Sequence, residues 1–294
     1  SGRGRVLLSA GPPDMIGAGP ENGGSAMHAL CRMAAVCLAV LPLCALAEGG
    51  GYWPEGRKAA VSLAYDDALD SQLDNAVPAL ARHGFKATFY VPPGQGTLDA
   101  RLDEWRAVAQ AGHELGNHSL FHQCDGTRPG RDWVVPHRDL HTTTVAQMHD
   151  QIQVANTFLR ALDGRSERSF TSPCGDRLAA DGDYVQALRD VFVAIKVSQG
   201  AHEAASMADF DRFAVPIIAP EGVSGRELIA MVEEAGRRGT VAAFTFHGIG
   251  GDYMSVSVQA HEELLAWLAE HRDEYWVAPM ADIGAWVRDH PPSP

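Results

Sequence analysis

The feature that most constrains the fold is a regular alternation of short apolar segments with longer amphipathic ones, from about residue 58 to about residue 280. The short segments are rich in β-branched and aromatic residues, and they predict strands at 59–65, 86–91, 113–117, 168–172, 191–197, 212–217, 241–247 and 275–278. The longer segments repeat apolar residues every three or four positions, and they predict helices at 70–83, 99–111, 142–163, 178–189, 224–237 and 257–272.

This alternation predicts an α/β fold with a parallel sheet, because consecutive parallel strands need a crossover that is usually a helix. Several of the strands are almost entirely apolar, as strands covered on both faces are. No repeat and no low-complexity linker divides residues 48–294, so we expect one domain. A sheet that closes, or nearly closes, into a (β/α) barrel is the favoured arrangement, and an open doubly wound sheet is the alternative.

The N-terminal part predicts export. An uncharged apolar stretch at 33–47 follows a histidine and an arginine, is too short to cross a bilayer comfortably, and ends in Ala-Leu-Ala. We expect a signal peptide at 27–47, cut after Ala47, and a disordered upstream extension at 1–26. A buried N-terminal helix and a lipoprotein anchor at Cys44 are the weaker alternatives. The mature domain would then be residues 48–294, in the periplasm or secreted.

The charge balance limits the partners. Lys and Arg total 24 against 37 Asp and Glu, which gives a net charge of -13. A chain of this charge has no basic surface for nucleic acid and is poorly suited to an anionic membrane surface. We therefore expect no nucleic-acid partner and no membrane span in the mature domain.

Ionisable residues follow three of the predicted strands at the point where each strand ends. Asp66 and Asp67 follow the first strand, His118 and His122 follow the third, and His247 closes the seventh. The C-terminal ends of the strands in a parallel barrel share one face, so we expect these side chains to converge.

The two histidines after the third strand are spaced to bind one metal ion. His122 comes four positions after His118, and an aspartate from the neighbouring pair would complete a three-ligand set with an open position, which is typical of catalytic zinc. An N-cap role would explain one aspartate of the pair but not two. A second pair, His137 and His141, has the same spacing, but it lies in a polar loop without an acidic partner, so we expect it to be solvated.

A long connection at 123–141 contains several Gly and Pro residues and one tryptophan, Trp133. An insertion of this length in a compact domain is usually a binding loop or a disordered one. Trp133 could stack on a sugar ring or pin the loop to the core, and the sequence does not choose between them.

These residues, in this order, resemble the polysaccharide deacetylases of the NodB-homology family (carbohydrate esterase family four). Asp66-Asp67 resembles the family's first motif, and His118-Ser-Leu-Phe-His122 its second. Residues 170–175 are similar to the third motif, and His247 stands where the fifth has its histidine. The resemblance runs from about residue 58 to 281 and implies a distorted barrel of seven or eight strands.

The resemblance also implies a role for each residue. Asp67, His118 and His122 would hold one divalent metal ion, most simply Zn²⁺, with Co²⁺, Ni²⁺ or Mn²⁺ as alternatives. Asp66 would be the general base and His247 the general acid.

The backbone around Pro173 and Cys174 would contribute to the oxyanion hole. The activity implied is hydrolytic removal of acetyl groups, by metal-activated water, from a chitin-like or peptidoglycan-like N-acetylated polysaccharide or oligosaccharide. An O-acetyl esterase acting on an acetyl-xylan-type polymer and an inactive carbohydrate-binding protein of the same fold are the alternatives.

The sequence departs from the family pattern around the third and fifth motifs. Thr171 replaces the arginine that braces the base, and Cys174 replaces an aromatic residue. Ala68 stands in place of glycine and Thr245 in place of leucine, and we find no fourth motif, which would orient the acid. Asp176 and Asp252 are both candidates for orienting His247.

Two cysteines remain beyond the predicted signal peptide, Cys124 and Cys174. An even number in an exported chain favours a disulfide. If the strand ends converge, the two thiols lie within bonding reach, and the disulfide would brace the loop that carries the metal ligands.

Overall fold

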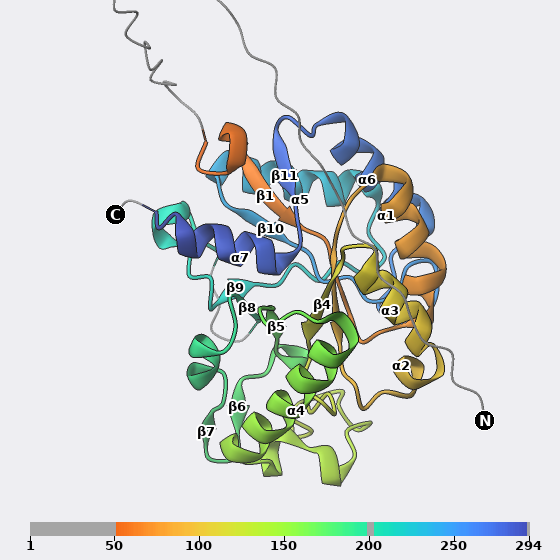
Figure 1. Ribbon diagram of the computed structural model, residues 1–294, viewed down its shortest axis with the longest axis vertical. Helices are drawn as coiled ribbons and strands as arrows, with labels where there is room; N and C mark the ends of the chain where they lie inside the picture. Colours follow the sequence, from red (N-terminus) through yellow and green to blue (C-terminus); the bar gives the residue numbers. More distant parts are fainter. Residues whose placement is uncertain (1–50, 199–202, 293–294) are drawn as a thin grey trace, which may run out of the picture. The chain divides into compact units, whose positions relative to one another are not determined.

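Parallel strands form the framework of the protein, which a computed structural model describes for residues 51–198 and 203–292 (Figure 1). The predicted extension and signal peptide at 1–47 lie outside the described residues. The strands of the framework are β1 (Ala59–Ser62), β2 (Ala64–Asp66), β3 (Thr88–Val91), β4 (Glu114–Asn117), β5 (Phe170–Thr171), β8 (Ile195–Val197), β9 (Val215–Pro216), β10 (Val241–Ala243) and β11 (Tyr275–Val277).

Each predicted strand is present, and the first is divided at Leu63 because its two halves have different partners. β1 pairs with β10 and β11, whereas β2 pairs with β3. One sheet has the order β10-β1-β11 and the other β2-β3-β4-β5-β8-β9, with every pairing parallel.

Two isolated bridges connect these sheets. Ile218, just beyond β9, pairs with Phe244, and Phe246 pairs with Tyr65 of β2. The strands therefore curl into a distorted, incompletely paired barrel, which confirms the α/β fold class. The C-terminal ends of β2, β4 and β5 lie at one rim, where the predicted site residues follow them.

Helices surround the strands, with α1 and α3 at the right and α4 at the lower end in Figure 1. They are α1 (Val77–His83), α2 (Gly96–Ala100), α3 (Leu102–Gln110), α4 (Val145–Asp163), α5 (Gly225–Arg238), α6 (Val258–Glu270) and α7 (Met280–Asp289). A π-helical turn (Gln72–Ala76) leads into α1. Within the described ranges, none of the helices has both the length and the apolar character needed to cross a bilayer.

Capping residues define the ends of the longest helices. The Thr144 side chain accepts from the Gln147 amide at the start of α4, and Ser224 does the same with Glu227 at the start of α5. In both helices the Gln or Glu side chain reaches back to the cap residue, which completes a capping box. Sequence alone carries these signals, which is why both predicted helices lie within three residues of the observed bounds.

The prediction of a helix at 178–189 is wrong. This segment forms an antiparallel hairpin of β6 (Leu178–Ala179) and β7 (Gly182–Asp183), followed by a 3-10 turn (Gln186–Asp190). Gly182 has a φ of 153°, and the Asp183 side chain accepts from the Val185 amide two residues on. This local turn chemistry competes with the helix. α7 was not predicted at all.

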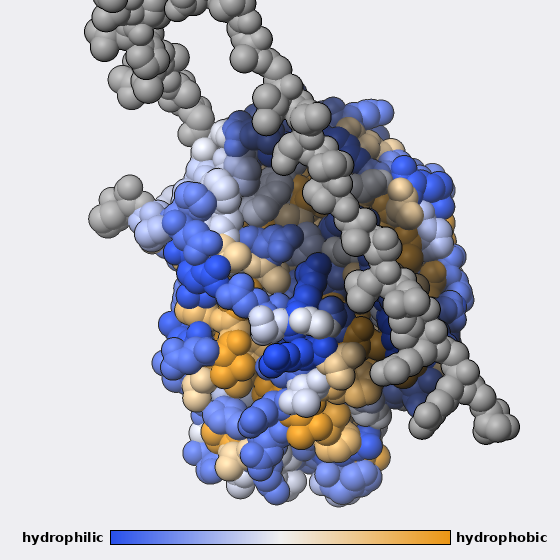
Figure 2. Space-filling view, viewed as in Figure 1, coloured by the Kyte–Doolittle hydropathy of each residue, from blue (hydrophilic) through white to orange (hydrophobic). Residues whose placement is uncertain are grey.

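The main core lies between the strands and helices α1, α3, α5 and α6. Its centre is aromatic: the Tyr65 ring lies 4.9 Å from that of Phe89 and 5.5 Å from that of Phe246. On the outer face shown in Figure 2, apolar and polar side chains are mixed over α4, where Val154 and Phe158 are exposed. The apolar residues of the strands are thus buried in the interior.

Because two histidines are buried, we expect the free energy of unfolding to fall in acid. Burial lowers the pKa of both His113 and His261 to about 4, whereas a histidine of the unfolded chain titrates near 6.5. The unfolded state therefore binds more protons as the pH falls from about 6.5 to 4, and the folded state loses about 2 kcal/mol per histidine at pH 5. Urea unfolding at pH 7.5 and pH 5 measures this loss.

His113→Asn is the matched variant, because an amide oxygen can still accept the Ala87 N–H that now bonds to His113 Nδ1. It should show a smaller loss between pH 7.5 and pH 5, by about 2 kcal/mol. An unchanged loss would contradict the assignment of the acid sensitivity to this histidine.

Candidate active site

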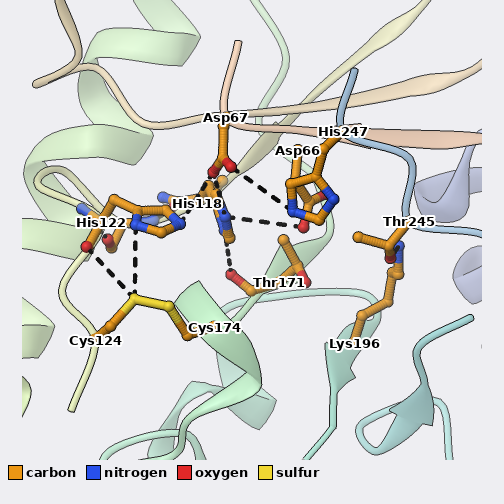
Figure 3. Close-up of polar contacts among 12 residues, drawn as sticks. Asp66, Asp67, His118, His122, Cys124, Thr171, Cys174, Lys196, Thr245 and His247 are labelled. Carbon is orange, nitrogen blue, oxygen red and sulfur yellow. Dashed lines mark hydrogen bonds and ion pairs between the residues drawn. A yellow bond between two sulfur atoms is a disulfide. The ribbon is translucent and has the colours of Figure 1, made fainter. Parts of the chain in front are cut away.

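The structure brings together five of the predicted site residues at one rim of the barrel (Figure 3). Asp66 ends β2 and Asp67 follows it, His118 comes directly after β4, and His122 lies one short turn further on. His247 follows Phe246, the residue bridged to β2. Figure 3 shows their side chains pointing toward one another from these separate strand ends.

Asp67, His118 and His122 present three metal-ligating atoms to one point. Asp67 Oδ1 lies 3.2 Å from His118 Nε2 and 3.0 Å from His122 Nε2, and the three atoms lie within 4.8 Å of one another. His118 Nδ1 lies 2.9 Å from the carbonyl oxygen of Thr171, which can only accept. Nδ1 therefore carries the proton, and the lone pair of Nε2 is free for a metal ion. This donor set fits a divalent ion such as Zn²⁺.

The charges of this cluster are strongly coupled. Burial alone would raise the pKa of Asp67, but the neighbouring imidazoles of His122 and His118 outweigh it and hold the pKa well below its usual range. Burial alone would lower the pKa of His118, and the carboxylates of Asp66 and Asp67 outweigh it and raise the pKa. The site thus concentrates negative charge that a cation or protonated imidazoles must balance.

Left-handed backbone conformations are concentrated around the site. Asp67, Ala68, Ser119, His122 and Cys174 have φ values of 78°, 54°, 59°, 52° and 55°. Such conformations are unfavourable for residues other than glycine and persist where the surrounding structure enforces them. The φ of 54° at Ala68 is one that glycine adopts without strain, in keeping with the glycine that the family resemblance implies at this position.

Local hydrogen bonds shape the turn that carries the two histidines. The Asn117 side chain accepts from the Ser119 amide at 2.8 Å, and the Ser119 hydroxyl accepts from the His122 amide at 3.1 Å. The Asn117 amide group also donates to the carbonyl of Ile152 in α4 at 3.0 Å. The turn is therefore anchored to a long helix behind it.

The structure contains the disulfide expected between Cys124 and Cys174, whose Cα atoms lie 5.7 Å apart. The Sγ atom of Cys124 lies 3.7 Å from His122 Nδ1. The bond thus connects the turn carrying a candidate ligand to the turn after β5, and it backs the imidazole on the side away from Asp67 (Figure 3).

Asp66 and His247 flank the cluster. One oxygen of Asp66 lies 3.8 Å from His118 Nε2, and the other, Oδ1, is buried without a hydrogen-bond partner among the described residues. His247 Nε2 lies 3.7 Å from Asp67 Oδ2. The Gln72 side chain donates to the backbone carbonyls of both Asp66 and His247, at 2.6 Å and 3.1 Å, and so ties the two strand ends together.

Neither candidate for orienting His247 contacts it. Asp176 forms ion pairs with Arg128 and Arg131, and Asp252 accepts from the backbone amide of Ser71 at 2.9 Å. Both aspartates instead hold loops at the rim. Nδ1 of His247 is buried and has no hydrogen-bond partner in the part of the chain that the structure describes.

Sequence analysis missed one residue of the site, Tyr253. Its hydroxyl donates to Asp67 Oδ2 at 2.8 Å, so it fixes the rotation of the candidate ligand carboxylate. Burial raises the pKa of Tyr253, as does the Asp67 carboxylate, so the hydroxyl stays a donor. The glycine-rich segment after His247 was the available signal, since an aromatic residue six positions beyond it can fold back over the rim.

A cavity of about 750 Å³ opens over the five residues. The turn at Pro173–Gly175 forms part of its wall, and Trp133, Tyr253 and Met254 also line it. Trp133 is 58% exposed, so it does not pin its loop to the core. Its place on the cavity wall favours the alternative, a stacking surface for a sugar ring.

Comparison with known proteins identifies the family. Residues 54–191 match the family model described as polysaccharide deacetylase. These residues belong to the polysaccharide deacetylase family. The family assignment confirms the resemblance found in the sequence, and the matched segment contains both aspartates and both candidate ligand histidines, whereas His247 lies beyond it.

Two solved structures share the fold. A putative polysaccharide deacetylase from Mycobacterium smegmatis has a TM-score of 0.57 at 17% identity, over 82% of this chain and 94% of that one. The Xyl-CE4 domain of a multidomain xylanase from the hindgut metagenome of Trinervitermes trinervoides has a TM-score of 0.50, also at 17% identity, over 81% and 93%. At these identities the likeness concerns the fold.

A gellan lyase from a Bacillus species is 24% identical over 123 residues. The match covers 42% of this chain but 4% of the lyase, so the chain spans a small fraction of that relative's length.

We expect the disulfide to raise the free energy of unfolding by a measurable amount. It closes a loop of 50 residues, so the double variant Cys124→Ser/Cys174→Ser should lose about 2–5 kcal/mol of unfolding free energy, chiefly through a less constrained unfolded state. Urea unfolding of the oxidised parent and the double variant measures the difference. Equal free energies would show that the bond does not brace this part of the fold.

The ligand cluster predicts one metal site. We expect the protein to bind one Zn²⁺ per chain, and Asp67→Asn or His122→Asn to weaken binding at least about 100-fold, measured by competition with a chromogenic chelator. His137→Asn is the control, because it removes a histidine of the exposed second pair. A loss of affinity in the control equal to that in His122→Asn would place the ion elsewhere.

Proposed function

We propose that this protein is a metal-dependent hydrolase that removes acetyl groups from an N-acetylated polysaccharide or oligosaccharide, chitin-like or peptidoglycan-like. The observation that carries this proposal is a three-atom ligand set, Asp67, His118 and His122, beside a second carboxylate, Asp66, that is not part of it. A structural metal site would need a fourth protein ligand and no adjacent free carboxylate.

Asp66 is placed to act as the general base. A bound divalent ion supplies a Lewis acid and lowers the pKa of water, which makes a nucleophile at neutral pH. The carboxylate of Asp66 accepts the proton as water attacks the acetyl carbonyl carbon. Asp66 lines the cavity, and its Oδ1 atom accepts no hydrogen bond from the described residues, so the carboxylate has an acceptor site left for that proton.

The turn at Pro173–Gly175 supplies a donor for the oxyanion. The Gly175 and Asp176 amides already bond to the carbonyls of Ser172 and Pro173, at 2.9 Å and 3.0 Å. Pro173 has no N–H, so the Cys174 amide is the donor of this turn that can face the cavity. A preorganised backbone amide stabilises charge that develops on the carbonyl oxygen.

His247 is placed to act as the general acid. An amine leaves poorly unless it is protonated, and imidazole is the side chain best suited to give up a proton near neutral pH. Its Nε2 lies near Asp67 Oδ2, on the side of the cluster opposite His122 (Figure 3). Asp66 and His247 come from adjacent strand ends whose backbone carbonyls both accept from Gln72, so base and acid both border the space where the acetyl group would lie.

A carbohydrate substrate is supported by the aromatic residues on the cavity wall. Trp133 and Tyr253 are 58% and 52% exposed and line the cavity, so their rings offer surfaces on which a sugar ring can stack. We further propose that the protein acts in the periplasm or outside the cell, because a disulfide and a predicted signal peptide both point to an oxidising compartment.

Acetate release tests this proposal. The parent should release acetate from chitooligosaccharides or peptidoglycan, and chelation should abolish the release, with recovery on adding Zn²⁺. Asp66→Asn should lower kcat at least about 100-fold without loss of metal binding, because it removes the base and keeps the ligands. Asp99→Asn, an exposed aspartate of α2, is the control for a loss of one negative charge.

Each outcome distinguishes a candidate function. Release from acetyl xylan alone would make the protein an O-acetyl esterase. Saccharide binding without release from any substrate would favour the inactive binding protein. Release that survives both chelation and Asp66→Asn would refute the mechanism.

A further inference from the structure

Lys196 is a fully buried cation that the mechanism above does not use. It lies on β8, and its Nζ donates to the carbonyl of Phe244 at 2.8 Å and to Thr245 Oγ1 at 2.6 Å. Those acceptors lie two and three residues before His247. A buried ammonium group is costly unless anions and acceptors compensate it, so its presence needs an explanation.

The ammonium group of Lys196 lies 5.0 Å from the centre of the Tyr90 ring, and Tyr90 is the register partner of Asp66 on the neighbouring strand. Burial lowers the pKa of Lys196 to about 8, and the negative charges of Asp66 and Glu114 oppose the fall. Glu114 is already satisfied, since it accepts from Thr88, from Ser169 and from the Ala281 amide. Asp66 is the carboxylate that still lacks a partner at Oδ1.

The neighbouring strand shows where a cation would otherwise be expected. Thr171 of β5 is the register partner of Lys196, so the two side chains start side by side. The family resemblance implies an arginine at position 171 that braces the base, and this chain has a threonine whose Oγ1 is buried without a hydrogen-bond partner among the described residues. Figure 3 shows Thr171 between His118 and the pair formed by Lys196 and Thr245.

We propose that Lys196 is a positioning residue of this site: from β8 it supplies the buried positive charge that balances Asp66, in place of a cation at position 171. The hydrogen bonds to Phe244 and Thr245 hold the ammonium group in the barrel interior, facing the rim. The inference rests on the proposed deacetylase function, and Lys196 acts through Asp66 without touching the substrate.

Lys196→Met tests the proposal, because it keeps most of the length of the unbranched side chain and removes the charge. We expect kcat for acetate release to fall at least 30-fold, KM to change less than 3-fold and zinc affinity to stay within 3-fold of the parent. Thermal stability should fall, because the change removes one member of a buried charge pair and leaves the other uncompensated, so kcat is measured at a temperature at which the variant is folded. A variant that does not fold, or whose activity falls only in step with its stability, would overturn the proposal in favour of a structural role. Parent-like kcat would overturn it too.

Moving the positive charge from position 196 to position 171 gives the second test. Lys196→Ala alone should be as slow as Lys196→Met, and adding Thr171→Arg should restore kcat at least 10-fold by bringing a cation from the adjacent strand. Thr245→Val is the matched control: it removes one hydrogen bond, keeps the charge and should lower kcat less than 5-fold. Failure of Thr171→Arg to restore activity in a folded double variant, or a loss in Thr245→Val equal to that in Lys196→Met, would overturn the proposal. A parent that releases no acetate would instead refute the proposed function.

Discussion

The site depends on one buried carboxylate held between two imidazoles. Asp67 is almost fully buried, and such a charge is unfavourable in a protein interior unless cations or donors surround it. Here the imidazoles of His118 and His122 lie beside its Oδ1 atom, and the hydroxyl of Tyr253 donates to its Oδ2 atom. The arrangement explains why the neighbouring backbone adopts left-handed conformations: the chain has to turn sharply after β2 to aim this side chain inward.

The rest of the rim is built to keep those groups in place. Gln72 connects the backbone carbonyls at the ends of two strands, and the disulfide connects two turns that are 50 residues apart in the chain. Side-chain acceptors close the turn between the two histidines. A metal site assembled from separate strand ends needs such supports, because each ligand's position is only as precise as the loop that carries it.

The barrel interior is unusual in holding three charged groups below the rim. Glu114 is fully buried and accepts four hydrogen bonds, Lys196 is equally buried and donates two, and Asp66 lies at the level of the site. An apolar interior would be more stable, so retained charges of this kind point to a functional requirement. Position 171, where the family resemblance implies an arginine, is a threonine, and a lysine stands beside it, which agrees with the proposal that one positive charge is needed there.

The sequence by itself determined the positions of the strands along the chain, most helices and the residues of the candidate site. Apolar periodicity and capping residues are local signals, and parallel strands place their C-terminal ends together. It misjudged 178–189, where a glycine and an aspartate favour a hairpin. Only the tertiary structure decided that Asp176 and Asp252 hold loops rather than His247, that Tyr253 folds back onto Asp67, and that Lys196 stands beside Thr171. These contacts join residues far apart in the chain through strand register and loop conformation, and no local pattern of residue types encodes either.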